Sequence, residues 1–269
     1  LWRASRAEVG SEGILRLRLT IDAFELMAVP WELLYDETLG RSVALDGQTP
    51  VTRFTRLPMP SVPWPQDRPL HLLFTGSSPS DMPTLNVAEE WAGIEQMIAP
   101  LVKQGRLETP DPIPEGATLP SLLAALRRKV DIWHFAGHGT DNGLIFCKDH
   151  NKANPVDAGE LGHMLRGEGV RLAVINACRA GAGGGQAASV AGALLRANIP
   201  SVVAMQANVS DVAADTFAGA FYDAIAVGQD VDQAVTSARK AIWAAGTHEW
   251  WTPALFMRTP EGRIWRMPV

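Results

Sequence analysis

A histidine and a cysteine each stand where an apolar strand pattern runs into small residues. His138 lies between two glycines in HFAGHG at residues 134–139, and Cys178 follows the apolar run LAVINA at residues 172–177. In open α/β sheets, ligands bind at the carboxyl ends of the strands. The separation of 40 residues leaves room for one short strand and one helix, so we expect both residues on neighbouring parallel strands. A thiol beside an imidazole base has the geometry of nucleophilic catalysis.

The turns around these two residues offer the other parts of such a site. Glycines on both sides of His138 let the backbone turn sharply and approach a ligand closely. The backbone N–H groups of Gly139 and Cys178 are candidates for an oxyanion hole, provided that they converge on one carbonyl oxygen. The second cysteine, Cys147, follows GLIF at residues 143–146 and has no reactive neighbourhood, so we expect a structural thiol.

Two alternative kinds of site have weaker patterns. His134 and His138 would lie on one side of a strand, but no third ligand of suitable spacing follows, which argues against a zinc site. His134 is instead expected to pack or hydrogen-bond beneath the site. The run GAGGGQ at residues 181–186 lacks the Lys-Ser/Thr of a P-loop, so we predict a loop beside a substrate groove rather than a nucleotide site.

Apolar runs separated by helical patterns follow residue 69, and they predict a mainly parallel sheet that is buried on both faces. The predicted strands cover residues 70–74, 130–136, 172–177, 199–205 and 254–257, and the predicted helices cover residues 87–101, 118–128, 157–166, 187–197, 211–227 and 230–245. The predicted fold class is therefore α/β.

The first part of the chain has a different pattern. Residues 14–21 alternate apolar and polar side chains, which is typical of an edge or hairpin strand with one wet face. Residues 58–68, PMPSVPWPQDR, contain four prolines, and proline removes backbone donors. We therefore expect an N-terminal β-rich portion at residues 1–57, a proline-rich linker at 58–68 and an α/β core at 69–269.

Composition excludes several classes of protein. The chain is 46% hydrophobic and 20% charged, as in ordinary globular proteins, and its net charge of −5 argues against direct binding of nucleic acid. The apolar stretches are too short to span a bilayer, and no signal peptide is evident, so we expect a cytoplasmic protein with no membrane partner. Two cysteines without an export signal are expected to be free thiols. A first residue of Leu rather than Met leaves room for upstream domains.

Several motifs in order resemble one known group. The sequence is similar to the CHAT family of caspase-like (clan CD) cysteine peptidases, related to caspases and separase. The resemblance covers essentially the whole chain and rests on PWELLYD at 30–36, ALD at 44–46, TPV at 49–51, HFAGHG at 134–139, INACRAG at 175–181, VAGALLRANIPSVVA at 190–204, FYDAI at 221–225 and WWTPALF at 250–256. It implies a three-layer caspase-like fold and a cysteine endopeptidase that cleaves a partner protein through a thioester acyl-enzyme.

The resemblance also implies roles for single residues. His138 maps to the catalytic base and Cys178 to the nucleophile, with no metal or organic cofactor. Asn176 stands for the Gln of the animal-caspase signature and Ala180 is interposed before the glycine, so the caspase preference for aspartate is not carried over. Asp211 ends a stretch in which separase-like relatives place an Asp that pairs with a substrate arginine. Asp211 and Asn176 are thus predicted to bind substrate, with a basic residue before the cut.

The resemblance implies a bacterial protein, coupled to an upstream sensor or regulatory domain and used in defence or regulated proteolysis, with a gasdermin-like or other protein as substrate. The competing class is a non-catalytic caspase-like interaction module that binds a peptide without cutting it. A thiol acyltransferase, which would use an amine acceptor instead of water, is a third reading.

Overall fold

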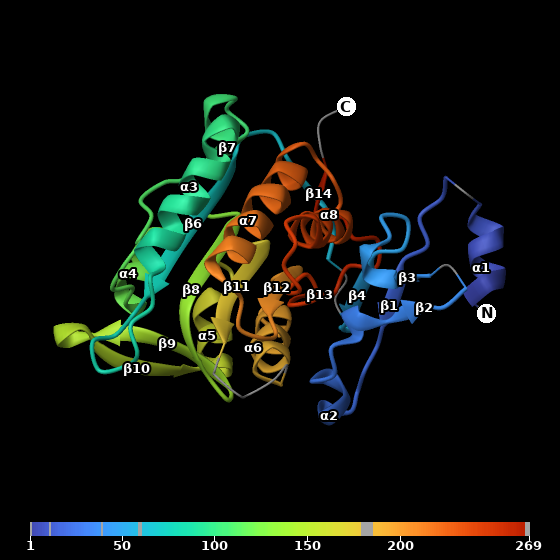
Figure 1. Ribbon diagram of the computed structural model, residues 1–269. Helices are drawn as coiled ribbons and strands as arrows, with labels where there is room; N and C mark the ends of the chain where they lie inside the picture. The colour runs from blue at the N-terminus through green and yellow to red at the C-terminus, as the bar shows by residue number, and fades with distance from the viewer. Residues whose placement is uncertain (1, 11, 39, 59–60, 179–184, 267–269) are drawn as a thin grey trace.

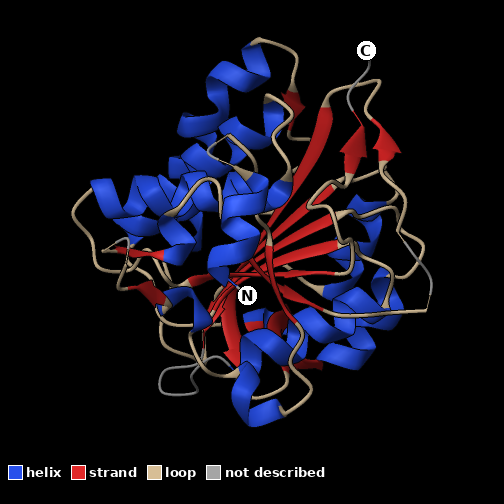
Figure 2. Cartoon of the chain, turned by 90° about the vertical axis from the view of Figure 1, so that its right-hand side faces the viewer, coloured by secondary structure: helices blue, strands red, loops and turns tan. Residues whose placement is uncertain are grey.

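The fold is built around one ten-stranded, mainly parallel sheet (Figures 1 and 2). The computed structural model describes residues 2–10, 12–38, 40–58, 61–178 and 185–266. The strands of the sheet are β1 (Leu17–Leu19), β4 (Val51–Phe54), β6 (Leu70–Ser77), β7 (Leu107–Glu108), β8 (Ile132–Thr140), β9 (Gly143–Lys148), β10 (Lys152–Asp157), β11 (Leu172–Cys178), β12 (Ser201–Met205) and β13 (Pro253–Met257). Their order is β1-β4-β13-β12-β11-β8-β6-β7, and β9 and β10 extend from β8 as an antiparallel hairpin.

Helices cover both faces of the sheet. They are α3 (Val87–Lys103), α4 (Leu119–Leu126), α5 (Ala158–Leu165), α6 (Gly185–Arg196), α7 (Asp211–Ala226) and α8 (Val231–Ala244). One apolar core lies between the sheet and α3, α7 and α8, and a second lies on the side of α4, α5 and α6. The central strands are buried on both sides, which explains their continuous apolar sequences. The predicted α/β class with a mainly parallel sheet is confirmed.

The sequence-based bounds differ from the structure mainly at strand ends. β8 was expected to end at residue 136, but it continues to Thr140, so His138 lies inside the strand rather than in a turn after it. The cause is pairing on both sides: β8 pairs with β11 through His138 and with β9 at Gly139. The prediction had no strands β4, β7 or β10; in β10, Pro155 lowers strand propensity.

The N-terminal part joins the same sheet through β4, which pairs in parallel with β13. Among the described residues β1 pairs only with β4, so it is an edge strand, one of the two possibilities that its alternation predicted. Its other elements are α1 (Trp2–Val9), α2 (Phe24–Met27), the 3₁₀ helices η1 (Trp31–Leu33) and η2 (Val43–Leu45), and the short pair β2 (Tyr35–Asp36) and β3 (Arg41–Ser42).

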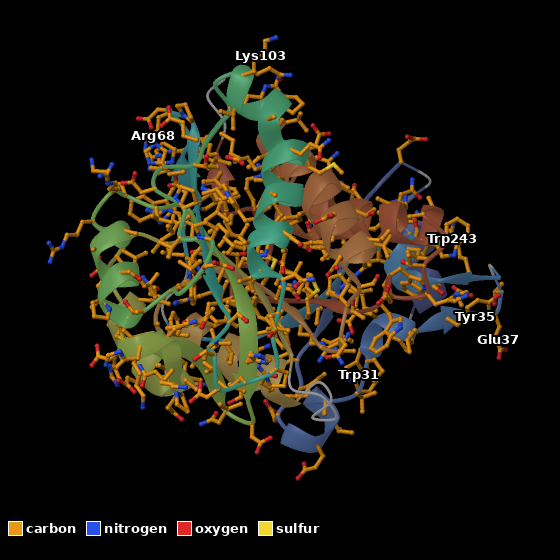
Figure 3. The ribbon with its side chains drawn as sticks, turned by 60° about the vertical axis from the view of Figure 1, so that its left-hand side comes forward. Trp31, Tyr35, Glu37, Arg68, Lys103 and Trp243 are labelled. Carbon is orange, nitrogen blue, oxygen red and sulfur yellow. The ribbon has the colours of Figure 1, made fainter. Side chains whose placement is uncertain are left out.

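Contacts with α8 fix this part against the core. The helix η2 contacts α8, and Figure 3 shows Trp31 and Tyr35 on the same side of the molecule as Trp243 of α8. Within residues 58–68, β5 (Trp64–Pro65) pairs with β14 (Trp265–Arg266), and Trp265 is buried against the core. Within the described ranges, no helix is both long enough and apolar enough to cross a membrane.

Candidate active site

His138 and Cys178 lie on neighbouring strands at the same level. The strands β8 and β11 run parallel, and their register pairs Cys178 with His138. Cys178 is the last residue of β11, as the sequence predicted. The prediction that both residues lie on adjacent parallel strands is therefore confirmed. The glycine-rich turn predicted at residues 181–185 lies outside the described residues except for Gly185, the first residue of α6.

The imidazole of His138 is held by a backbone carbonyl. Its Nε2 lies 2.7 Å from the carbonyl oxygen of Pro83, in the segment between β6 and α3. A carbonyl oxygen only accepts hydrogen bonds, so Nε2 carries the proton and donates. In the neutral ring the remaining lone pair is on Nδ1. Nδ1 is therefore the nitrogen that can accept a proton.

The glycines that flank His138 allow close packing within the strand. A Cβ added at Gly137 would lie 2.8 Å from the backbone oxygen of Ser77 on β6, and one at Gly139 would collide with the side chain of Gln186. Gln186 is buried in the first turn of α6. The glycines thus bring β6, β8 and the start of α6 together at the level of His138, rather than forming the sharp turn that the sequence predicted.

A cavity of about 810 Å³ opens beside His138. It brings together His138, Gly139, Asn176 and Asp211, all of which the sequence singled out. The polar side chains in its described lining are Asn86, Glu90, His138, Thr140, Asp141, Asn176, Asn208 and Asp211, and they include three carboxylates but no lysine or arginine. The cavity therefore has a negative lining that favours a cationic group.

Asp211 reaches this cavity from the start of α7. Ser210 caps the helix by accepting a hydrogen bond from the backbone N–H of Ala213, and Asp211 is the first helical residue. A carboxylate in the first turn is stabilised by the positive end of the helix dipole. Asp211 is exposed at the cavity, so its charge is available to a ligand that enters.

Glu90 is a site residue that sequence reasoning missed. Asn176 donates a 2.8 Å hydrogen bond from Nδ2 to Oε1 of Glu90, which comes from the first turn of α3. The same oxygen lies 3.5 Å from Nε2 of His134. His134 is buried and its Nδ1 lies 2.8 Å from the hydroxyl of Tyr222. His134 thus hydrogen-bonds beneath the site, as predicted.

The polar contacts from Tyr222 through His134 to Glu90 support the part of the cavity lining that Glu90 and Asn176 form. Complete burial, followed by the charge of Glu90, raises the pKa of the Tyr222 hydroxyl, which stays protonated. A glutamate in the first turn of a helix is common, so nothing local in the sequence marks Glu90 as a cavity residue. The hydrogen bond with Asn176 is the contact that identifies Glu90 as part of the site.

Asp215, one turn after Asp211 on α7, gives a prediction on stability. Its carboxylate lies against Gly93 of α3, and its buried Oδ1 has no hydrogen-bond partner among the described atoms. Burial, then Glu90 and Asp211, raise the pKa of Asp215. The folded state therefore favours the protonated form, and the contribution of Asp215 to stability is lost as pH rises through its raised pKa.

We expect Asp215→Asn to be more stable than the parent chain at pH 7, by about 0.5 kcal/mol because partial exposure screens the repulsion. The gain in stability should vanish at about pH 3, where the Asp215 carboxyl of the parent is protonated in both the folded and the unfolded chain. Thermal unfolding at both pH values measures it, with Asp223→Asn on the exposed face of α7 as control. A gain that is the same at both pH values would contradict the argument.

Comparisons with known proteins agree with this architecture. A family model described as the CHAT domain matches residues 1–260. The fold is similar to that of the Arg specific cysteine proteinase gingipain R, with a TM-score of 0.53 at 11% identity over 84% of this chain and 59% of that one. It is also similar to the complex of Porphyromonas gingivalis RgpB pro- and mature domains, with a TM-score of 0.58 at 13% identity over 97% and 68%.

A third similar structure is the Saccharomyces cerevisiae separase-securin complex, with a TM-score of 0.54 at 13% identity, over 95% of this chain and 16% of that one. These similarities show the caspase-like fold that the sequence predicted. The chain spans 59% of the length of gingipain R. The search of curated proteins found no match.

Proposed function

Because the chain belongs to the CHAT domain family, we propose that it is a cysteine endopeptidase with Cys178 as nucleophile and His138 as general base. The observation that carries the proposal is the strand register, which pairs Cys178 with His138 at the edge of an acidic cavity. Residues that pair in register on adjacent parallel strands are direct neighbours, which supports proton exchange between a thiol and an imidazole at these two positions.

The reaction would proceed in two steps. In the first, His138 takes the proton of the Cys178 thiol, the thiolate attacks the scissile carbonyl, the carbon–nitrogen bond breaks, and the same proton passes from His138 to the leaving amine. In the second, His138 takes a proton from a water molecule whose oxygen attacks the thioester; the carbon–sulfur bond breaks, the acid leaves, and the proton passes from His138 back to the Cys178 sulfur. The hydrogen bond from Nε2 to Pro83 O supports this role, since it orients the ring and leaves Nδ1 as the basic nitrogen.

The negative charge that develops on the substrate oxygen needs donors. We assign this role to the backbone N–H groups of Gly139 and Cys178, as the sequence predicted. Gly139 follows His138, with which Cys178 pairs in register, so the two N–H groups lie at neighbouring levels of β8 and β11. Donors fixed by a strand need no reorganisation as the charge forms.

Substrate recognition is proposed to favour a basic residue before the cut. The described lining of the cavity contains carboxylates and no lysine or arginine, and Asp211 is one of its two exposed acids, with Asp141. The similar gingipain R is an Arg specific cysteine proteinase. A guanidinium or ammonium facing Asp211, with Asn176 and Glu90 in the lining, would form charge-assisted hydrogen bonds.

We expect Asp211→Asn to lower kcat/KM for substrates with Arg or Lys before the cut by about tenfold, the equivalent of one charge-assisted hydrogen bond. Competition in a peptide library with every residue at this position measures the change. Cleavage of peptides with an uncharged residue there serves as the internal control. A preference of the parent chain for acidic or apolar residues alone would refute the assignment of Asp211.

The enzyme itself is tested by mapping the reactive thiol. A chloromethylketone peptide ending in Arg should label Cys178 and leave Cys147 unlabelled, because Cys147 is buried with its sulfur 3.4 Å from the Ser77 hydroxyl. Digestion and mass spectrometry identify the labelled residue. Equal labelling of both cysteines, or binding of the peptide without covalent labelling or turnover, would favour a non-catalytic interaction module.

The biological setting is proposed from the family resemblance. The substrate would be a partner protein, gasdermin-like or of another kind, and cleavage would serve bacterial defence or regulated proteolysis in the cytoplasm under the control of a sensor domain. Incubation of the chain with candidate partner proteins, followed by sequencing of the new N-termini, identifies the substrate and the residue before the cut.

A further inference from the structure

One wall of the cavity is a short segment that follows β12. Asn208, Val209 and Asp211 line the cavity, and Gln206 connects them to the last strand residue, Met205. Unlike its neighbours in the wall, Gln206 is buried, at 3% exposure. Its side chain therefore points into the protein, where its contacts can hold the start of the wall in place.

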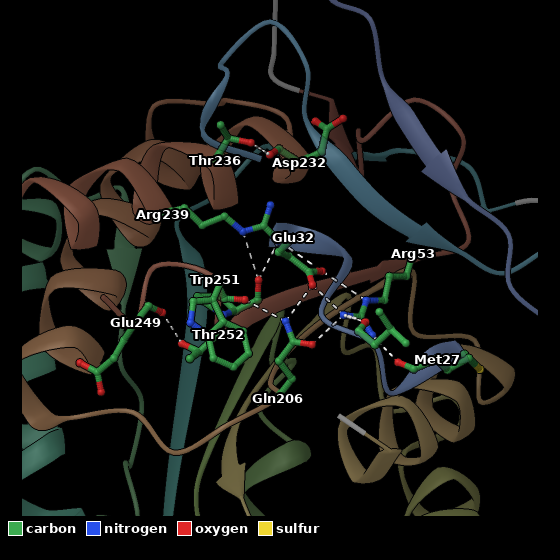
Figure 4. Close-up of polar contacts among 12 residues, drawn as sticks. Met27, Glu32, Arg53, Gln206, Asp232, Thr236, Arg239, Glu249, Trp251 and Thr252 are labelled. Carbon is green, nitrogen blue, oxygen red and sulfur yellow. Dashed lines mark hydrogen bonds and ion pairs between the residues drawn. The ribbon is translucent and has the colours of Figure 1, made fainter. Parts of the chain in front are cut away.

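The Gln206 amide uses both of its ends (Figure 4). Its Oε1 accepts a 2.7 Å hydrogen bond from Nη2 of Arg53, and its Nε2 donates to Oε2 of Glu32 at 2.7 Å and to the backbone oxygen of Trp251 at 2.8 Å. The backbone N–H of Gln206 donates to the oxygen of Thr252 at 3.0 Å. Gln206 thus joins the wall to two other parts of the chain.

Glu32 and Arg53 belong to the N-terminal part, in η1 and β4. They are buried at 0% and 2% exposure and form a two-pronged ion pair, with Arg53 Nε 3.2 Å from Oε1 and Nη2 2.6 Å from Oε2. Arg53 also donates to the backbone oxygens of Met27 and Val29. The position of the pair is therefore tied to the backbone around η1.

The other end of the wall is held by the turn before β13. Ser210 donates from its backbone N–H and its hydroxyl to the Glu249 carboxylate at 2.8 and 2.6 Å. Residues 249–252 contact both ends of the wall, since Gln206 binds Trp251 and Thr252. Asn208 and Val209 thus lie between two fixed points, and movement at either one changes the cavity.

We propose that Gln206 is a positioning residue for substrate recognition, and that Glu32 and Arg53 of the N-terminal part set the position of the cavity wall through it. A change in the N-terminal part would then alter substrate binding without touching His138 or Cys178. The kinetic readout rests on the proposed endopeptidase function, whereas the positioning itself does not.

The first test is kinetic. Gln206→Met keeps the size of the side chain and removes its three side-chain hydrogen bonds, and we expect KM for an Arg-containing peptide to rise about tenfold because the wall loses its anchor. The value of kcat and the rate of Cys178 alkylation by iodoacetamide should stay within about twofold, because the dyad is not displaced. Should Gln206→Met not fold, Gln206→Asn, which is too short to span the same partners, replaces it.

The matched control is Arg258→Met, at the opposite end of the same strands. Arg258 is also buried, and it donates to Asn198 Oδ1 at 2.6 Å and to the Leu195 oxygen at 3.2 Å. It should lose stability but keep KM. An unchanged KM in Gln206→Met, or an equal rise in Arg258→Met, overturns the proposal.

The second test separates this proposal from the proposed function. Amide hydrogen exchange of residues 207–211, measured by mass spectrometry, should become about tenfold faster in Gln206→Met and in Glu32→Gln but not in Arg258→Met. If no peptide is cleaved by the parent chain, this result still supports the positioning role while the enzyme proposal fails. Exchange that is unchanged in Gln206→Met and Glu32→Gln overturns the positioning role.

Discussion

Replacing His138 with alanine is expected to lower kcat on an Arg-containing peptide by about 10⁴- to 10⁶-fold, as for other enzymes that lose a base from a nucleophilic pair. Without the imidazole, no other group among the residues that the structure describes at the paired level of β8 and β11 can take the thiol proton or protonate the leaving amine. KM should change little, because the cavity wall and Asp211 are untouched. Steady-state kinetics on the purified variant measure both values.

Cys178→Ala should lose the same activity, since attack by sulfur forms the acyl-enzyme. The matched controls are His163→Ala, on the exposed part of α5, and Cys147→Ala, in the core. Both should keep the kcat of the parent within about twofold. Cleavage at the parental rate by Cys178→Ala or by His138→Ala would mean that other residues carry out the reaction.

The sequence predicts the residues of this site that lie on strands. Apolar runs at residues 130–136 and 172–177 are long enough to identify β8 and β11, and a parallel crossover through a hairpin and one helix makes them neighbours. The ends of the two runs place His138 and Cys178 at nearly the same level, and the ladder between β8 and β11 sets the pairing itself. The pairing of His138 and Cys178 on neighbouring strands was thus predictable because both residues follow strong strand patterns.

The supporting residues have no such pattern. Pro83 contributes only a backbone oxygen, which any residue would supply, and Glu90 meets Asn176 across 86 positions of sequence. Contacts of this kind are decided by how helix α3 packs on the sheet, which residue types alone do not fix. The hydrogen bond between Gln206 and Glu32 spans 174 positions. It depends in a similar way on how the N-terminal part packs on the sheet.

The extension of β8 shows the limit of local propensity. Glycine weakens a strand pattern, so Gly137 and Gly139 indicated a turn. Both stay in the strand because β8 is paired on both sides, and glycine fits there because Ser77 and Gln186 pack against the space that a Cβ would occupy. Tertiary packing therefore overrides the local preference at the residues that flank the proposed base.

The second large effect concerns Glu32. Two guanidinium groups, those of Arg53 and Arg239, are buried beside this single carboxylate, at 2.6 and 3.7 Å. Arg239 is fully buried, and its Nη1 has no hydrogen-bond partner among the described atoms. Burial, opposed by Glu32 and reinforced by Arg53, lowers the pKa of Arg239 to about 10. The cluster thus holds an excess positive charge even with Glu32 ionised.

Glu32→Gln should therefore cost about 3–5 kcal/mol of unfolding free energy, because it leaves two buried cations without an anion. Urea unfolding at pH 7 measures the loss as a lower midpoint at an unchanged slope. The double variant Glu32→Gln/Arg239→Met removes one of the two cations and should regain about half of the loss. A double variant no more stable than Glu32→Gln would show that repulsion between the guanidinium groups is not the cause.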